Sequence, residues 1–287
     1  TGCVVMAEIY TPGHGIVSDS LIMHGIVKLY DVKSVERVGD RFKIIGEFER
    51  PNKDVISLLK EELVIYSKNR DILKSSSILG KISDSNINVS VTPNWLTRLY
   101  NSLEEFKEDI TDVYVVNHKE KFKEGRVKKS RSYLLYLPLS FIYGKYSQSD
   151  YSVTAKDYSV CANCFALANI GLIYGTAVIK YVSKDKMSVT FITIIPDEKM
   201  DRTDLLLAQR FVQGKSVSLN TELTLKSVIL YALTIGETLF SFNSKLQILV
   251  WRLEKAKNFM RSLQPMTFSL SDLLEKIAKI KENYPYF

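Results

Sequence analysis

The sequence predicts an α+β protein: a mixed N-terminal α/β body that carries a basic hairpin or loop, followed by a C-terminal helical bundle. Hydrophobic residues make up 46% and charged residues 25% of the 287-residue chain, so it can bury a globular core. Strand-like and helix-like patterns are mixed up to Pro196, and the segments after it are mainly helix-like. We therefore expect two domains, residues 1–198 and residues 199–287.

The first elements follow from short-range patterns. Cys3–Tyr10 is a β-prone run that ends at a Thr-Pro-Gly turn, and Ser18–Tyr30 has helical periodicity. Val32–Val38 and Phe42–Phe48 form a predicted hairpin across Gly-Asp. Asn52 is placed to cap a second helix, since its side chain can accept from an exposed amide of the first turn.

The middle of the chain is more polar at first. Lys74–Asn88 is rich in Ser and Asn and predicts a surface loop, and Thr92-Pro93 predicts a helix start, where proline gives up no needed hydrogen bond. Val113–Val116 and Tyr133–Leu137 are predicted strands that flank the basic segment. Lys186–Ile195 alternates and then becomes wholly apolar, as a central strand would.

Val160–Ile179 is a segment of twenty residues without a charge. Its asparagines and glycines lower its hydrophobicity below that of a spanning helix, so we predict a buried helix that runs into a strand, and no membrane association. The N-terminus lacks the pattern of a signal peptide. With only three cysteines in the chain, a reducing, cytoplasmic location is expected.

The segments after Pro196 predict four helices. They are Met200–Val212, Thr221–Phe240, Lys245–Met260 and Ser269–Lys281. The last follows a Ser-x-x-Asp capping box, and the third has an apolar stripe at helical spacing. Consecutive helices of this kind are typical of a bundle.

A basic segment lies at residues 118–131. It holds seven cations and two glutamates, a net charge of +5 within a formal chain charge of +7. A row of cations suits a polyanion, because each contacted phosphate releases condensed counterions, whereas a solvated surface loop is the alternative. The cations are Lys119, Lys121, Lys123, Arg126, Lys128, Lys129 and Arg131.

Two further segments favour nucleic acid. Tyr143–Tyr151 interleaves aromatic residues with Lys145, a composition that can stack bases. Arg252, Lys255 and Arg261 would give the third C-terminal helix a basic side.

Metal binding is the weaker interpretation of the cysteine pair. Cys161 and Cys164 have zinc-like spacing, but zinc needs about four ligands and no second pair exists. We predict small buried residues at a helix start, no metal and no cofactor. Cys3, His14, His24 and His118 would contribute ligands only if the fold brought them together.

His14, Asp19 and His24 could be imagined as an acid/base group beside a glycine-rich turn. Their spacing of five residues gives no shared helical face, so structural use is favoured, with Gly25 allowing close helix packing. No Gly-x-Ser-x-Gly, His-Glu-x-x-His or phosphate-binding loop occurs. We therefore predict a protein that is not an enzyme.

The chain resembles the large subunit of archaeal type I-A CRISPR effector complexes (Cascade). The resemblance rests on Ser18–Ile26 (SDSLIMHGI), the lysine-rich mid-chain loop, Leu137-Pro138, Gly144-Lys145-Tyr146 and the predicted helical C-terminus. It implies a non-catalytic subunit that reads the short flanking motif on double-stranded DNA, holds the displaced strand and recruits the helicase-nuclease.

The resemblance also implies partners: duplex DNA, the displaced single strand, the other subunits of the guide RNA complex and the helicase-nuclease. The seven cations of residues 118–131 would contact the duplex. Arg252, Lys255 and Arg261 would be lesser candidates for the displaced strand. Two alternatives remain: an archaeal or viral nucleic-acid-binding protein outside CRISPR, and a metal-dependent nuclease or thiol-redox protein.

Overall fold

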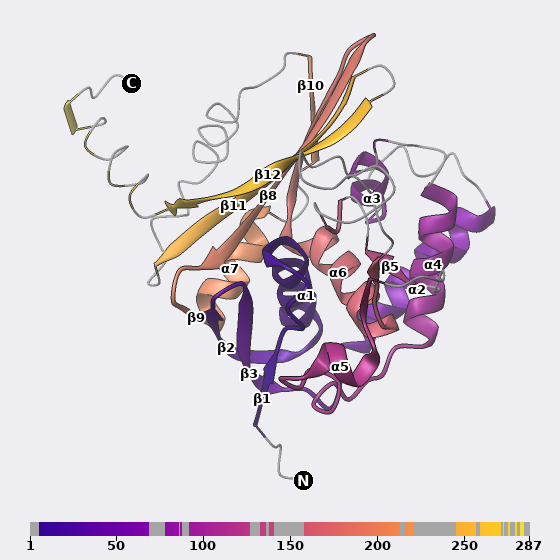
Figure 1. Ribbon diagram of the computed structural model, residues 1–287, viewed down its shortest axis with the longest axis vertical. Coiled ribbons are helices and arrows are strands. Elements are labelled where there is room, and N and C mark those ends of the chain that lie inside the picture. Colours follow the sequence, from indigo (N-terminus) through magenta and orange to yellow (C-terminus); the bar gives the residue numbers. More distant parts are fainter. Residues whose placement is uncertain are drawn as a thin grey trace.

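The computed structural model describes residues 6–68, 78–85, 87, 92–126, 133–135, 138–140, 158–212, 216–220, 245–256, 259–270, 272, 275, 279 and 282–283. Helices and sheets occur together along this part of the chain, which confirms the α+β class. Helices α1 and α6 lie at the centre, with a four-stranded sheet on one side and a five-stranded sheet extending from one end (Figure 1).

The N-terminal predictions are confirmed from residue 6 on, and residues 3–5 of the first predicted strand lie outside the described part. Strand β1 (Ala7–Tyr10), helix α1 (Ile16–Leu29) and the hairpin of β2 (Asp31–Val38) and β3 (Arg41–Glu47) follow in the expected order. Gly39 turns the hairpin with a φ of 64°, a conformation that glycine adopts without strain. With β9 (Lys199–Asp201) these strands form an antiparallel sheet in the order β1-β3-β2-β9.

Helix α2 (Lys53–Lys68) begins at its predicted cap. The Asn52 side chain accepts a hydrogen bond of 3.1 Å from the amide of Asp54. Helix α4 (Thr92–Glu104) starts at Thr92 as expected. The loop predicted over Lys74–Asn88 is wrong in part, because helix α3 (Gly80–Ser85) lies within it and buries Ile82 in the core.

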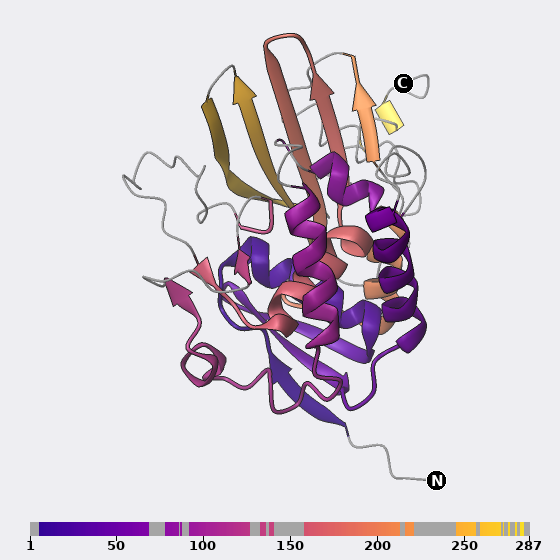
Figure 2. The ribbon, with the colours of Figure 1, turned by 90° about the vertical axis from the view of Figure 1, so that its right-hand side faces the viewer.

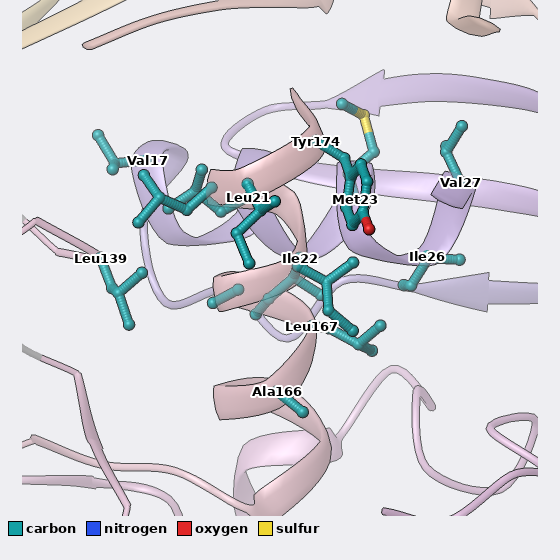
Figure 3. Close-up of a cluster of buried hydrophobic side chains, with 14 of the residues drawn as sticks. Val17, Leu21, Ile22, Met23, Ile26, Val27, Leu139, Ala166, Leu167 and Tyr174 are labelled. Carbon is teal, nitrogen blue, oxygen red and sulfur yellow. The ribbon is translucent and has the colours of Figure 1, made fainter. Parts of the chain in front are cut away.

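The uncharged segment forms helix α6 (Ala162–Gly175) and strand β7 (Ala177–Val182), as predicted. Every residue of α6 is buried, and its side chains interdigitate with those of α1, which Figure 3 shows around Leu21 and Leu167. Gly25 of α1 lies against the backbone of Leu167, so the close packing expected at Gly25 is confirmed. Within the described part of the chain, no helix combines the length and apolarity that a membrane crossing requires.

The five-stranded sheet has the order β10-β7-β8-β11-β12. Strand β8 (Lys186–Pro196) lies at its centre and is almost wholly buried, as predicted for a central strand. Helix α7 (Arg202–Val212), within the predicted helix over Met200–Val212, precedes β10 (Ser216–Leu219). Strands β11 (Leu246–Ala256) and β12 (Phe259–Ser269) complete the sheet.

The predicted helix over Lys245–Met260 is wrong, because β11 and β12 form an antiparallel hairpin there. All eleven residues of β11 pair with β8, and Trp251 stacks on Phe191 with ring centroids 5.1 Å apart. The helical spacing of the apolar residues favoured a helix, but the pairing with β8 overrides this local preference. The predicted helical bundle is thus replaced by sheet over Leu246–Ala256 and Phe259–Ser269.

The rest of the predicted bundle is only partly described. Thr221–Phe240 lies outside the described residues. Ser269 caps as predicted, since the amide of Asp272 donates to Ser269 Oγ over 3.3 Å, and Leu270, Asp272 and Glu275 are helical. Strands from both sides of the predicted boundary at residue 198 pair in one sheet.

Candidate nucleic-acid interface

The basic segment begins as a short helix and not as a hairpin. Val113–Val116, predicted as a strand, is a turn that leads into helix α5 (His118–Phe122). Lys123 ends α5 in the left-handed conformation, with a φ of 53°. Strand β4 (Gly125–Arg126) then pairs with β6 (Tyr158–Ser159), which pairs in turn with β5 (Leu134–Leu135).

The lysines of α5 lie close to the body. Lys119 Nζ donates to the carbonyl of Gly13 over 2.8 Å, and Lys121 Nζ donates to that of Asp112 over 2.5 Å. The side chains of Lys121 and Lys123 are exposed, whereas that of Lys119 is half-buried. An ammonium has three donors, so one internal hydrogen bond leaves capacity for an anion. The structure therefore holds three of the predicted cations on one short, anchored segment.

The structure gives less information on the other predicted cations. Arg126 lies in β4, so its backbone position is known. Lys128, Lys129, Arg131 and Lys145 lie outside the described residues.

A cluster of two histidines, a glutamate and a cysteine anchors α5: His14, His118, Glu124 and Cys164, which we call the His-Glu-Cys cluster. Glu124 Oε2 lies 2.8 Å from His14 Nε2 and 3.0 Å from His118 Nε2. Cys164 Sγ lies 3.3 Å from the same His118 nitrogen. The fold has thus brought together two of the named histidines and the cysteine pair.

The protonation of the cluster follows from these contacts. Burial lowers the pKa of His118, but its interactions with Cys161 and Glu124 outweigh burial and raise the pKa to about 10. Burial opposes ionisation of Glu124, yet the two imidazoles hold its pKa well below the usual range. The pKa of Cys161 is lowered to about 7, chiefly by its hydrogen bond with Cys164 and against the opposing effect of burial.

The cysteine pair begins α6 as predicted. Cys161 is the N-cap, and its Sγ accepts the amide hydrogen of Cys164 over 3.4 Å. Sequence reasoning missed Glu124, which it counted only as a charge among lysines. The one sequence feature that could have pointed to Glu124 is its position six residues after His118.

His24 is not a member of the His-Glu-Cys cluster, and Asp19 interacts with His14 without belonging to the cluster. His24 is fully buried, its Nε2 lies 2.8 Å from the carbonyl of Ile194, and burial lowers its pKa to about 4. Asp19 accepts the amide of Gly13 over 2.8 Å and so braces the glycine turn. Both contacts agree with the predicted structural use.

The second predicted basic surface consists of Arg252, Lys255 and Arg261. These residues lie on β11 and β12 and not on one helix, so they do not share one face. Arg252 is buried in the sheet and its Nε donates to Thr190 Oγ1 over 2.7 Å. Lys255 is half-buried on the same strand, and strand alternation places it on the other face from Arg252. Arg261 lies in β12 opposite Glu254.

The tertiary structure adds two lysines that sequence reasoning missed. Lys184 and Lys186 lie at the turn of the β7–β8 hairpin, and Lys186 pairs with Ala256, next to Lys255. This end of the sheet and α5 lie at opposite ends of the molecule in both views (Figures 1 and 2). No sequence spacing connects residues 184–186 with residue 255, so only strand pairing could find this set.

Comparison with known proteins identifies the family. Residues 7–286 match the family model described as CRISPR-associated protein (Cas_Csa4). A curated protein of Thermoproteus tenax, named CRISPR system associated protein Cas8, is 33% identical over 310 residues, an alignment that covers 97% of this chain and 82% of that protein. These matches confirm the resemblance to the Cascade large subunit, and they exclude a nucleic-acid-binding protein outside CRISPR. The chain belongs to the Cas_Csa4 family of CRISPR-associated proteins.

Proposed function

We propose that the chain is the non-catalytic DNA-binding subunit of a type I-A CRISPR interference complex. In this role it recognises the short flanking motif, stabilises the displaced strand and recruits the helicase-nuclease. Two observations carry the proposal. The chain is a CRISPR-associated protein, and its basic segment is anchored through α5 so that the side chains of Lys121 and Lys123 are exposed. In such complexes the protein reads a short motif and the backbone, while guide pairing reads the sequence.

We propose that residues 118–131 contact the duplex. Lys121 and Lys123 project from a segment that is fixed at both ends: His118 is buried, and β4 is paired with β6. A fixed segment binds a polyanion with a smaller cost in conformational entropy than a free loop. The other proposed contacts in this segment are Lys119, Arg126, Lys128, Lys129 and Arg131, and Lys145 is proposed as a separate nucleic-acid contact.

The displaced strand is proposed to contact the far end of the five-stranded sheet. Lys186 pairs with Ala256 and Lys255 pairs with Met187, so these two lysines lie at the same end of the sheet on opposite faces. Lys184 is exposed in the adjoining turn, and Arg261 lies on the neighbouring strand. Arg252 is left out, because it is buried and bonded to Thr190. The two surfaces would hold different parts of one opened DNA target.

The number of carboxylates in the candidate metal cluster supports the proposed non-catalytic role. Two-metal nuclease chemistry needs several carboxylates that converge on the ions. Among the described residues, the one cluster able to hold a metal contains a single carboxylate, Glu124. We infer that cleavage belongs to the recruited partner.

Duplex binding at several salt concentrations tests the proposal. Replacing Lys121 and Lys123 by Ala should reduce the log–log salt slope by up to about 1.8, because each phosphate that the protein no longer neutralises lowers it by about 0.9. The matched control replaces Lys33 and Lys53, two exposed lysines on β2 and α2, and should leave the slope unchanged. Equal slopes for both double variants would show that α5 is solvated surface. Co-purification with the guide RNA complex tests the assembly separately.

A further inference from the structure

The His-Glu-Cys cluster joins three segments that are far apart in the sequence. His14 comes from the turn before α1, His118 and Glu124 come from α5 and the residue before β4, and Cys164 comes from the first turn of α6. The histidines and Cys164 are buried, and the Glu124 side chain is 1% exposed. One ligand-type atom from each residue lies within 4.8 Å of the other three.

The orientation of the His118 imidazole leaves an acceptor facing the Glu124 carboxylate. His118 Nδ1 lies 2.6 Å from the carbonyl oxygen of Val113, which can only accept, so this nitrogen carries the proton. In the neutral ring, Nε2 then presents a lone pair to Glu124 Oε2 and to Cys164 Sγ. His14 Nε2 and Glu124 Oε2 are buried and face each other over 2.8 Å.

Buried acceptors that converge in this way require a cation among them. A proton on His118 is one solution, and a metal ion is the other. The histidines already have the outer contacts of metal ligands, because His118 Nδ1 is held by a backbone carbonyl and His14 Nδ1 lies 2.9 Å from the hydroxyl of Tyr158. Such contacts fix the ring and direct Nε2 to the ion.

The spacing fits a tetrahedral ion. Ligand bonds of about 2.0 Å for nitrogen and oxygen and about 2.3 Å for sulfur imply ligand–ligand separations of roughly 3.3–3.6 Å. Three of the six separations are 2.8, 3.0 and 3.3 Å, and all six are within 4.8 Å, so small shifts would admit the ion. Two imidazoles, a carboxylate and a thiolate form a donor set that suits zinc.

We propose that His14, His118, Glu124 and Cys164 bind a structural zinc ion. The ion would hold α5 against the turn before α1 and the start of α6, so that the lysines of α5 keep a fixed position. Four protein ligands leave no open coordination position for substrate, which is the mark of a structural site. Cys161 is not one of the proposed ligands and remains the N-cap of α6.

Metal analysis of the full chain tests the proposal without reference to DNA binding. After incubation with zinc chloride and gel filtration, we expect about one zinc per chain and a melting temperature above that of the chelator-treated protein. Cobalt substitution should show the thiolate charge-transfer band and strong visible bands of a tetrahedral site. No retained metal, together with an unchanged melting temperature, would overturn the proposal.

Glu124→Gln gives the sharpest variant. The amide keeps the shape, its oxygen can still accept from the amide of Cys161, and its NH₂ can donate to the imidazoles, so folding is preserved in the metal-free form. We expect loss of stoichiometric zinc. His24→Gln, at the third histidine of the chain, is the matched control and should retain the ion. Equal zinc content in the two variants would refute the assigned ligand set.

Discussion

Gly171 of α6 lies directly against Leu21 of α1. A Cβ built on Gly171 would come closer than 3.0 Å to the backbone carbonyl of Leu21, a separation that real Cβ atoms essentially never show. Gly25 stands in the reciprocal position against the backbone of Leu167. The two buried helices therefore pack backbone to backbone, and this pair positions the turn that carries His14 and the helix start that carries Cys164.

Gly171→Ala should destabilise the protein. In an exposed helix the change would add about 1 kcal/mol of stability through helix propensity. Here the methyl group would have to push the helices apart, and overpacking of this kind costs about 1–3 kcal/mol. Denaturant unfolding measures the difference. A Gly171→Ala protein more stable than the parent would contradict the close approach of the two helices.

Lys81 predicts a pH dependence of stability. Its buried ammonium donates to the carbonyls of Ile173, Thr176 and Val212 at the ends of α6 and α7, and burial lowers its pKa to about 7. Between about pH 7 and pH 10.5 the unfolded chain binds more protons at this group than the folded one, so stability rises with pH.

The measurement is the free energy of unfolding of the parent minus that of Lys81→Met. This difference should rise between pH 7 and pH 9.5, by up to about 1.4 kcal/mol per pH unit. Subtracting the variant removes the other groups that titrate in this range. A difference that stays constant across the range would show that Lys81 has the same protonation in both states.

Arg252→Met should reduce stability and leave nucleic-acid binding unchanged. Arg252 is buried and donates to Thr190 Oγ1. Removing the donor leaves a buried hydroxyl without this partner, at a cost of about 1–3 kcal/mol. Thermal unfolding and duplex binding are measured on the same sample. A weaker salt dependence of duplex binding with unchanged stability would show that Arg252 contacts DNA.

Lys184→Ala combined with Lys255→Ala should weaken single-strand binding. With two fewer phosphates neutralised, the log–log salt slope should fall by up to about 1.4, at about 0.7 per phosphate on single strands. Stability should change little, since charges near the protein surface contribute little. The Lys33 and Lys53 double variant is again the control. An unchanged slope would place the displaced strand elsewhere.

Local patterns predicted much of the fold. The hairpin at Gly39, the cap at Asn52 and the buried segment that becomes α6 and β7 depend on turn chemistry, capping and hydrophobicity, which act between near neighbours. The α+β class followed from these elements. The segment that holds β11 was predicted as a helix, because its apolar residues recur at helical spacing. Pairing with β8 over its whole length decided its structure.

The sequence by itself determined where the positive charge lies and which residue types were available to bind. From the sequence, His14, His118, Cys161 and Cys164 were possible ligands only if the fold brought them together. The tertiary structure joined them through Glu124 and left His24 apart. It also buried Arg252 and brought Lys186 beside the end of β11. The physical reason is the same each time: contacts between distant segments depend on helix packing and strand register, which residue spacing does not encode.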